Sequence, residues 1–403
     1  MKIVMIRSFF CGNIRSWQVY CKWKRAFDII ESDKQEKYSL AGAALSWRCI
    51  FFVAVADGGK RMDKLERFKG CMLGGATGDA LGYVIEFDSL NAIRRKYGPH
   101  GLRTILKSKK DGNKAVISDD TQLTLFTADG LLWAAEDGVD SVDRVFRSYM
   151  RWYYTQTERI VKPEQKAWML RQPHEDKWGY DLMDTASLYV RRAPGKTCLQ
   201  SLAMGISFAA HEVPNSSKSG GAVKRAAPVG LFYSERPEEA FHVGCETAFL
   251  THGGSEAVVT TGSYCLLIAL LSKGMSLREA LPQVITKAEN EAGGELTAER
   301  LRMAVTEAES DRVPVDSIKR LTDSKHAAGI LAVAVYCILK TDSLRHAVIM
   351  SCNHDDDSNS CGTVCGSLAG TIYGAGAIPE GWLNTLECFD LLVGMSHSLY
   401  EAV

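Results

Sequence analysis

The sequence lacks several patterns that would assign it at once to a common class of protein. It has 48 Lys and Arg against 48 Asp and Glu, so neither sign of charge is in excess. A neutral chain gives no electrostatic reason to expect nucleic acid or an anionic membrane as a partner. No glycine-rich loop ends in Gly-Lys-Ser or Gly-Lys-Thr, which excludes the common phosphate-binding loop. No internal repeat is visible, which argues against a solenoid.

The cysteines lack the spacing of a metal site or of a disulfide framework. Twelve of them are scattered along the chain without a Cys-X-X-Cys pair. Zinc is not expected, because no His or Cys partners cluster beside Cys361 and Cys365. These two residues lie four apart on a predicted helix and are expected to pack as small apolar side chains. We therefore expect a reducing, cytoplasmic setting.

Runs that alternate apolar and polar residues are few, so a substantial β-sheet is not expected. The apolar content of 46% and the charged content of 24% are those of an ordinary globular protein. From Met62 onward the pattern is mostly helical. Residues 262–270 and 327–339 are nearly all apolar and suit helices at the centre of a bundle. The sequence therefore predicts an all-α fold.

The first 61 residues differ from the rest, with three Trp, three Cys and no clear amphipathic period. Residues 40–56 are apolar apart from Arg48, but they are short for a membrane span and carry a costly charge at their centre. A signal peptide would place its apolar region nearer the N-terminus. We interpret residues 1–61 as an upstream extension, which a misassigned start would explain, and residues 62–403 as the functional domain. No membrane partner is expected, although an anchor in residues 40–56 stays an open alternative.

Two acidic clusters each stand at the start of an apolar, helix-patterned stretch. The first is Ser118-Asp119-Asp120-Thr121, and the second is the segment DDDSNS at residues 355–360. Adjacent carboxylates repel one another and lower stability unless a cation neutralises them. Each cluster alone fits a helix N-cap, since Ser and Asp are favoured there. Adjacent carboxylates in both clusters, with hydroxyl and amide oxygens beside them, favour a site for a hard cation such as Mg²⁺ or Mn²⁺.

A stripe of glycines accompanies each acidic cluster. Within each stripe a glycine recurs at every fourth residue, which places the glycines on one face of a helix. Glycine inside a helix costs roughly 1 kcal/mol relative to alanine, so the simplest explanation is close approach of another backbone. A further step of four from the first stripe reaches Glu86, so we expect two tightly packed helices to bring Glu86 and both clusters together. The stripes are Gly70, Gly74, Gly78 and Gly82, and Gly362, Gly366, Gly370 and Gly374.

Five motifs in a fixed order resemble the ADP-ribosylglycohydrolase family, including its dinitrogenase-reductase-activating type. The resemblance extends from Met62 to about Glu387. The segment GCMLGGATGDALGYVIEF resembles the opening helix of the family, and Ser-Asp-Asp-Thr its first metal motif. The other three motifs are a glycine-rich substrate loop at residues 217–231, a Thr-His motif at residues 251–254, and a second metal motif that begins NHDDDSNS at residue 353.

The resemblance implies an all-α fold, a compact orthogonal bundle of many helices with a dimetal site in a central cleft. It also implies two divalent cations, Mg²⁺ or Mn²⁺, as cofactors. Glu86 and Asp119 match positions to which we assign catalytic roles. The implied metal ligands are Ser118, Asp119, Asp120, Asp357, Asn359 and Ser360, and the implied ADP-ribose-binding residues are Gly220, Gly221 and His252.

The chain departs from the family pattern at several of these motifs. Asn359 stands where the family normally has Asp, so one negative charge is lost from the site. Asp356 stands in place of the usual Gly and is a candidate to restore that charge. Lys224 occupies a position usually held by Met, and the Thr-His motif continues with Gly254 and Ser255 in place of a second His and a Pro. These changes bear on metal occupancy and turnover more than on the fold.

The function that the resemblance implies is hydrolysis that removes ADP-ribose from modified proteins or from small ADP-ribosyl compounds, by a chain expected to be a monomer. The alternative is a catalytically weak or inactive relative that binds ADP-ribose or serves structurally, which Asn359 favours. Retention of Asp119, Asp120 and Asp357 favours hydrolysis. From the residues alone, Gly220–Gly221 fits a plain loop and His252 a hydrogen-bonded core histidine. The sequence does not specify which acceptor residue is modified.

Overall fold

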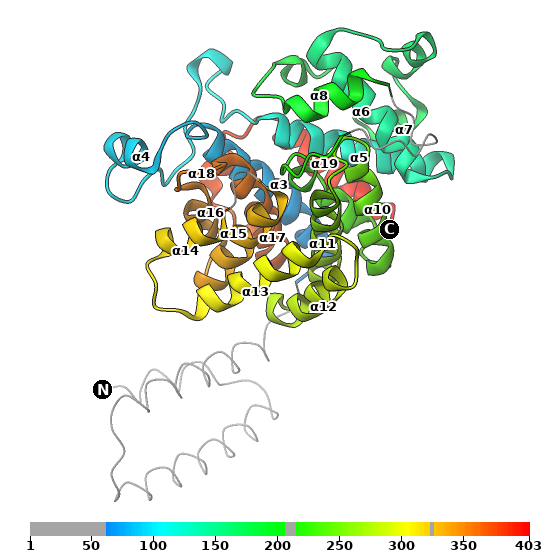
Figure 1. Cartoon of the computed structure of the whole chain (residues 1–403). Helices are drawn as coiled ribbons and strands as arrows, with labels where there is room; N and C mark the ends of the chain where they lie inside the picture. The colour runs from blue at the N-terminus through cyan, green and yellow to red at the C-terminus, as the bar shows by residue number, and fades with distance from the viewer. Residues whose placement is uncertain (1–61, 206–214, 323–325) are drawn as a thin grey trace, which may run out of the picture. The chain divides into compact units, whose positions relative to one another are not determined.

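The computed structural model describes residues 62–205, 215–322 and 326–403 (Figure 1). These residues belong to one unit, Met62–Val403. Across the described ranges three isolated bridges are the only β pairing, and the all-α prediction is confirmed. The expectations about an N-terminal extension and a membrane anchor concern residues 1–61, which lie outside the described residues.

The body is built from helices joined by turns, 3-10 segments and two longer loops, between α4 and α5 and between α7 and α8 (Figure 1). In chain order the α-helices are α3 (Lys64–Tyr83), α4 (Leu90–Tyr97), α5 (Asp119–Asp137), α6 (Ser141–Thr157), α7 (Pro173–Trp178), α8 (Lys196–Ala203), α9 (Ala227–Phe232), α10 (Pro237–Phe249), α11 (Ser255–Ser272), α12 (Leu277–Glu289), α13 (Glu295–Glu309), α14 (Pro314–Leu321), α15 (Ala327–Lys340), α16 (Leu344–Cys352), α17 (Ser358–Tyr373), α18 (Glu380–Leu383) and α19 (Phe389–Glu401).

Helices α3 and α17 pack against each other along their glycine stripes, near the middle of the body (Figure 1). A Cβ atom added at Gly74 would lie 2.2 Å from the carbonyl oxygen of Gly366, and one added at Gly70 would lie 2.1 Å from that of Gly370. Both distances are far inside van der Waals contact, so only glycine permits this separation of the two backbones. The predicted pairing of the two stripes is confirmed.

Helix α3 ends earlier than the stripe suggested. It ends at Tyr83 with Val84 as its C-cap, and the chain then turns. The turn directs Ile85 into the core, where its side chain is fully buried, and the backbone N–H of Glu86 donates to the carbonyl of Tyr83 at 3.4 Å. The expectation that the helical stripe continues to Glu86 is therefore wrong. The chain therefore leaves the helix axis before Glu86.

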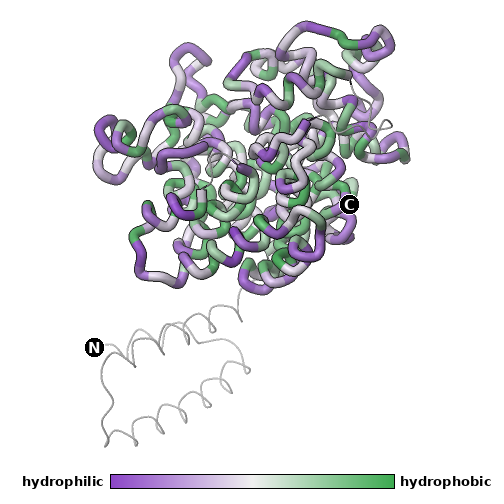
Figure 2. The backbone as a smooth tube through the Cα atoms, in the orientation of Figure 1, coloured by the Kyte–Doolittle hydropathy of each residue, from purple (hydrophilic) through white to green (hydrophobic). Residues whose placement is uncertain are grey.

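The two nearly all-apolar segments form core helices, as predicted. They lie in α11 and α15, and Figure 2 shows hydrophobic residues concentrated along the inner helices, with hydrophilic residues in the outer loops. Among the described residues, α11 is the one helix whose length and composition would allow it to cross a membrane. Within the fold, 89% of its apolar window is buried, which is the packing of a core helix.

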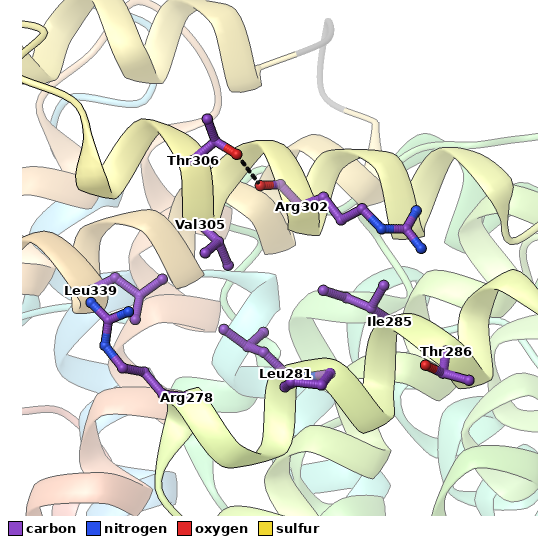
Figure 3. Close-up of a pocket in the computed structure, with 9 residues that line it drawn as sticks. Arg278, Leu281, Ile285, Thr286, Arg302, Val305, Thr306 and Leu339 are labelled. Atoms are coloured by element: carbon purple, nitrogen blue, oxygen red, sulfur yellow. Dashed lines mark hydrogen bonds between the residues drawn. The ribbon is translucent and has the colours of Figure 1, made fainter.

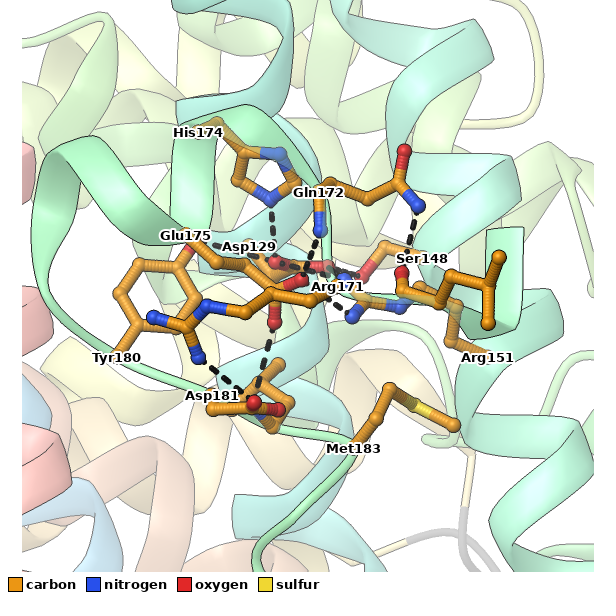
Figure 4. Close-up of polar contacts among 12 residues, drawn as sticks. Asp129, Ser148, Arg151, Arg171, Gln172, His174, Glu175, Tyr180, Asp181 and Met183 are labelled. Carbon is orange, nitrogen blue, oxygen red and sulfur yellow. Dashed lines mark hydrogen bonds and ion pairs between the residues drawn. The ribbon is translucent and has the colours of Figure 1, made fainter. Parts of the chain in front are cut away.

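A buried ionic network fastens α5, α6 and α7 together (Figure 4). The guanidinium of Arg151 on α6 contacts the carboxylates of Asp129 on α5, at 3.1 Å, and of Glu175 on α7, at 2.7 Å. His174 and the hydroxyl of Tyr180 also contact Asp129, at 2.8 and 3.0 Å. All four side chains of Arg151, Asp129, Glu175 and His174 are fully buried. The network therefore holds α5, whose first turn carries the acidic site, against its neighbours.

Candidate functional site

Asp79 on α3 organises the start of α5. Its carboxylate accepts hydrogen bonds from the Ser118 backbone N–H at 2.8 Å and hydroxyl at 2.6 Å. It also accepts from the Thr121 backbone N–H at 3.2 Å and hydroxyl at 2.6 Å. Asp79 is fully buried, and Ser118 is the N-cap of α5, accepting from the N–H of Asp120. A carboxylate at this end of the helix also suits the positive end of the helix dipole.

Asp119 and Asp120 are held by different partners. One carboxylate oxygen of Asp119 accepts from the backbone N–H of Gly195 at 3.1 Å. One oxygen of Asp120 accepts from the hydroxyl of Thr363 on α17 at 3.2 Å. The ammonium of Lys224 forms an ion pair with the other oxygen of Asp120 and lies 3.5 Å from Asp119. The first acidic cluster is therefore joined to α17 and to the loop that carries Lys224.

The second acidic cluster places only its last residues at this site. Asp357 is the N-cap of α17, and its side chain accepts from the N–H of Ser360. Asn359 is buried and donates through its amide nitrogen to the Ser118 hydroxyl at 3.4 Å. Asp355, by contrast, is exposed and accepts from the N–H of Leu90 at 2.8 Å. The two clusters therefore meet at their helix starts, while Asp355 points elsewhere.

The electrostatics show a surplus of carboxylates. Burial raises the pKa of Asp120 well above its ordinary value, and the charges of Asp119, Asp79 and Asp357 add to this while Lys224 opposes it. Burial alone would lower the pKa of Lys224, but Asp119, Asp120 and Asp357 raise it well above its ordinary value. The pKa of Asp120 is raised chiefly by burial, whereas that of Lys224 is raised by the three carboxylates. The site therefore favours further positive charge.

Glu86 lies in the turn after α3, half-buried. Glu86 and the acidic site both act on Tyr83. Burial raises the pKa of Tyr83, the charges of Glu86, Asp79 and Asp119 also raise it, and Arg192 opposes them. The same electrostatic neighbourhood therefore contains Glu86 and the acidic site. Its predicted catalytic role stays a prediction.

The predicted substrate loop is anchored beneath by His252. A Cβ atom at Gly221 would lie 2.8 Å from two ring atoms of His252, so glycine allows the loop to rest on the imidazole. The ring nitrogens contact the Ser219 hydroxyl at 3.0 Å and the Thr251 hydroxyl at 2.8 Å. The carbonyl of Gly220 accepts from the N–H of Lys224, which links this loop to the acidic site. His252 is fully buried, so the geometry fits support of the loop.

His252 is expected to make stability depend on pH. Burial, followed by the charges of Arg225 and Lys224, lowers the pKa of His252 to about 3. Between pH about 6.5 and about 3 the unfolded chain binds a proton here and the folded chain does not, so stability falls as pH falls. His252→Gln removes this contribution, which amounts to at most about 1.4 kcal/mol per pH unit. Urea unfolding at several pH values measures it, and parallel pH curves for the variant and the wild type would contradict it.

Sequence reasoning missed several residues that build the site. Asp79 lies inside the first glycine motif, and its signal was a lone carboxylate within an apolar helix. Thr363 is four residues after Asn359, hence on the same face of α17, where its hydroxyl reaches Asp120. Gly195 and the ion pair of Lys224 had no signal in sequence spacing, because both come from loops distant along the chain.

The donor atoms fit a hard divalent cation in part. The side-chain oxygens Oδ1 of Asn359 and Oγ of Ser360 are buried and have no hydrogen-bond partner. Among the described residues, however, no group of three or more His, Cys, Asp and Glu side chains is arranged to hold a metal. The site also contains Asn and Ser oxygens, and the Lys224 ammonium lies against the carboxylates of α5. The donor atoms are thus suited to a divalent cation. They include fewer carboxylates than a site built for two divalent cations.

A pocket lies away from these residues. It has a volume of about 530 Å³ and is bordered by α12, α13 and the end of α15 (Figure 3). Its lining includes Arg278, Leu281 and Arg302, and none of the predicted site residues. This pocket is therefore not the site that the sequence predicts.

Several known proteins are similar in sequence to this chain over most of its length. A protein of Archaeoglobus fulgidus described as uncharacterized is 26% identical over 337 residues, which cover 83% of this chain and 96% of that protein. The ADP-ribosyl-[dinitrogen reductase] glycohydrolase of Rhodospirillum rubrum is 23% identical over 330 residues, covering 80% and 90% of the two chains. The ADP-ribosylarginine hydrolase Tri1 of Serratia proteamaculans is 20% identical over 343 residues, covering 84% and 80%.

A solved structure supports the same fold, and a family model supports the same assignment. The structure is described as an ADP-ribosylglycohydrolase-related protein complex, and it matches this chain with a TM-score of 0.57 and 22% sequence identity. The match covers 84% of this chain and 98% of the chain in that structure. The family model for ADP-ribosylglycohydrolase matches residues 60–403. The chain therefore belongs to the ADP-ribosylglycohydrolase family.

Proposed function

We propose that this chain hydrolyses the glycosidic bond between ADP-ribose and a modified side chain of a protein, or the equivalent bond of a small ADP-ribosyl compound, with Mg²⁺ or Mn²⁺ as cofactor. Membership of the family supports hydrolysis as the reaction class. The observation that carries the proposal is that the buried carboxylates of Asp79 on α3 and Asp120 on α5 meet the start of α17, where the Thr363 hydroxyl donates to Asp120 and two buried oxygens, those of Asn359 and Ser360, have no hydrogen-bond partner.

The residues that the sequence predicts as ligands of two divalent cations are Ser118, Asp119, Asp120, Asp357, Asn359 and Ser360. A divalent cation bound by them would neutralise the crowded carboxylates and polarise a ribose hydroxyl or a water molecule. The reaction builds positive charge at the anomeric carbon, which carboxylates stabilise. Asp119 suits this task because the N–H of Gly195 fixes one of its oxygens and so orients the other. Glu86 is proposed to orient the sugar or to relay a proton.

Recognition of the diphosphate is assigned to the loop at Gly220 and Gly221. Successive backbone N–H groups in such a loop can receive a phosphate group. His252 supports the loop from beneath, with both ring nitrogens held by the hydroxyls of Ser219 and Thr251. In this assignment His252 positions the loop, and the backbone of Gly220 and Gly221 contacts the substrate.

The test is release of ADP-ribose from ADP-ribosylated arginine, serine and cysteine peptides by the full chain, with Mn²⁺ or Mg²⁺. We expect metal-dependent release from at least one of them, and Asp120→Asn should lower the rate by ~10²-fold or more, since general acid–base and electrostatic contributions are of that size. Asp355→Asn is the matched control in the second cluster. Its carboxylate faces Leu90, so release should stay at the wild-type rate.

The alternative function is binding of ADP-ribose without turnover. Two observations favour it, the amide of Asn359 in place of a carboxylate and the ion pair of Lys224 with Asp120. Calorimetric titration with ADP-ribose separates the two functions. Binding without release from any of the peptides would favour this alternative, whereas release from any of them would contradict it.

A further inference from the structure

Lys224 places an ammonium group at the acidic end of α5. It lies on the 3-10 turn η5 (Val223–Arg225), directly after the loop at Gly220 and Gly221. Its Nζ forms an ion pair with Asp120 and lies 3.5 Å from Asp119, and its side chain is about 10% exposed. A buried ammonium that has lost its hydration needs such anionic partners. These carboxylates are the ones that a divalent cation would need.

The second half of the site has a different character. Asn359 and Ser360 present the buried oxygens Oδ1 and Oγ without hydrogen-bond partners. Asp357 stands at the same helix start. The amide nitrogen of Asn359 donates to Ser118 at 3.4 Å, so this half adjoins the first cluster. The carboxylates of Asp119 and Asp120 are thus already paired with the Lys224 ammonium. The buried oxygens of Asn359 and Ser360, in contrast, lack a hydrogen-bond partner.

The Lys224 ammonium already stands against the carboxylates of Asp119 and Asp120. A divalent ion bound by the same two carboxylates would lie close to this ammonium, and like charges repel strongly where burial weakens the screening between them.

We propose that Lys224 is a built-in cation that takes the place of one divalent ion between Asp119 and Asp120, so that the chain binds a single divalent ion, beside Asp357, Asn359 and Ser360. The inference rests on the proposed function in one respect, that this cluster is the metal site. It makes Lys224 the residue that sets the metal stoichiometry. Removal of its charge frees the first position for a second ion.

The experiment counts Mn²⁺ bound per full-length chain, by equilibrium dialysis followed by elemental analysis. Wild type is expected to bind one ion and Lys224→Met two, because Met has a similar length and no charge. Lys224→Arg keeps the positive charge and should bind one ion. Lys218→Met is the matched control, since Lys218 is exposed, lies in the same loop and pairs with Glu256. It should also bind one.

Thermal unfolding provides a second readout that does not depend on activity. Without metal, Lys224→Met should unfold at a lower temperature than wild type, and saturating Mn²⁺ should raise its unfolding temperature more than that of wild type. Equal Mn²⁺ counts for wild type and Lys224→Met would overturn the inference, as would two ions in wild type. These outcomes leave the proposed hydrolysis intact. The proposed hydrolysis would fail by a separate result, the absence of ADP-ribose release by wild type. That result would not change the difference in bound Mn²⁺ between wild type and Lys224→Met.

Discussion

Replacing Gly366 with alanine is expected to lower the free energy of unfolding by about 3 kcal/mol or more. The added Cβ atom would lie 2.0 Å from the carbonyl oxygen of Gly74 and 2.6 Å from its carbonyl carbon. Both atoms belong to a helix backbone, which cannot rotate away as a flexible side chain can. Helices α3 and α17 must therefore separate, and Asp79 on α3 must move relative to Asn359 on α17. Urea unfolding at neutral pH measures the loss.

Gly394→Ala is the matched control for this prediction. Gly394 is also inside a helix, α19, but an added Cβ atom there meets nothing within 4 Å. Alanine is favoured over glycine in a helix by up to about 1 kcal/mol, so this variant should be as stable as wild type or slightly more stable. Equal stability of Gly366→Ala and Gly394→Ala would show that the two stripes do not require glycine.

The contact between the glycine stripes was predictable because its cause is local and periodic. A glycine at every fourth residue costs helix stability, and close approach of backbones is the simplest compensation. The structure pairs Gly70 with Gly370 and Gly74 with Gly366 along this face. The same pairing places the start of α17 beside the end of α3, and Asp79 on α3 holds the start of α5 through Ser118. The glycine spacing therefore permitted the meeting of the two acidic clusters, but it did not by itself require it.

The contents of the site were less predictable because they depend on side chains from distant loops. The position of the Lys224 ammonium follows from the path of the chain between Ser217 and η5, for which spacing offers no rule. Asp79 looked like one polar residue in an apolar helix, although it accepts four hydrogen bonds from Ser118 and Thr121. The position of Glu86 was predicted by extending a helix that in fact ends at Tyr83.

The buried ionic network had no sequence signal either. Arg151, Asp129 and Glu175 are charged residues in helical segments, and such residues are usually solvated. Their burial becomes visible only when α5, α6 and α7 are packed (Figure 4). Buried charged residues therefore form both the acidic site and the ionic network that supports α5. The sequence pattern alone did not distinguish them from exposed charged residues.

Replacing Arg151 with methionine is expected to lower the free energy of unfolding by about 3–5 kcal/mol, because it leaves two buried carboxylates without their cation. Its guanidinium contacts Asp129 at 3.1 Å and Glu175 at 2.7 Å, and all three side chains are fully buried. Arg171→Met is the control, since Arg171 forms ion pairs of similar length with Asp176 and Asp181 but is 43% exposed. That variant should lose about 1 kcal/mol at most.

The loss in Arg151→Met should also shrink as the solution is acidified. Burial alone would raise the pKa of Asp129, but Arg151, followed by His174 and Ser148, holds it at about 2. This pKa lies below that of the unfolded chain, so the stability contributed by Asp129 is present above pH about 4 and lost as pH falls toward 2. Without Arg151 the buried carboxylate favours its protonated form, and acid then relieves part of the penalty. The difference in urea-unfolding free energy between wild type and variant should therefore be larger at pH 7 than at pH 4, and a difference that grows on acidification would contradict the role assigned to Arg151.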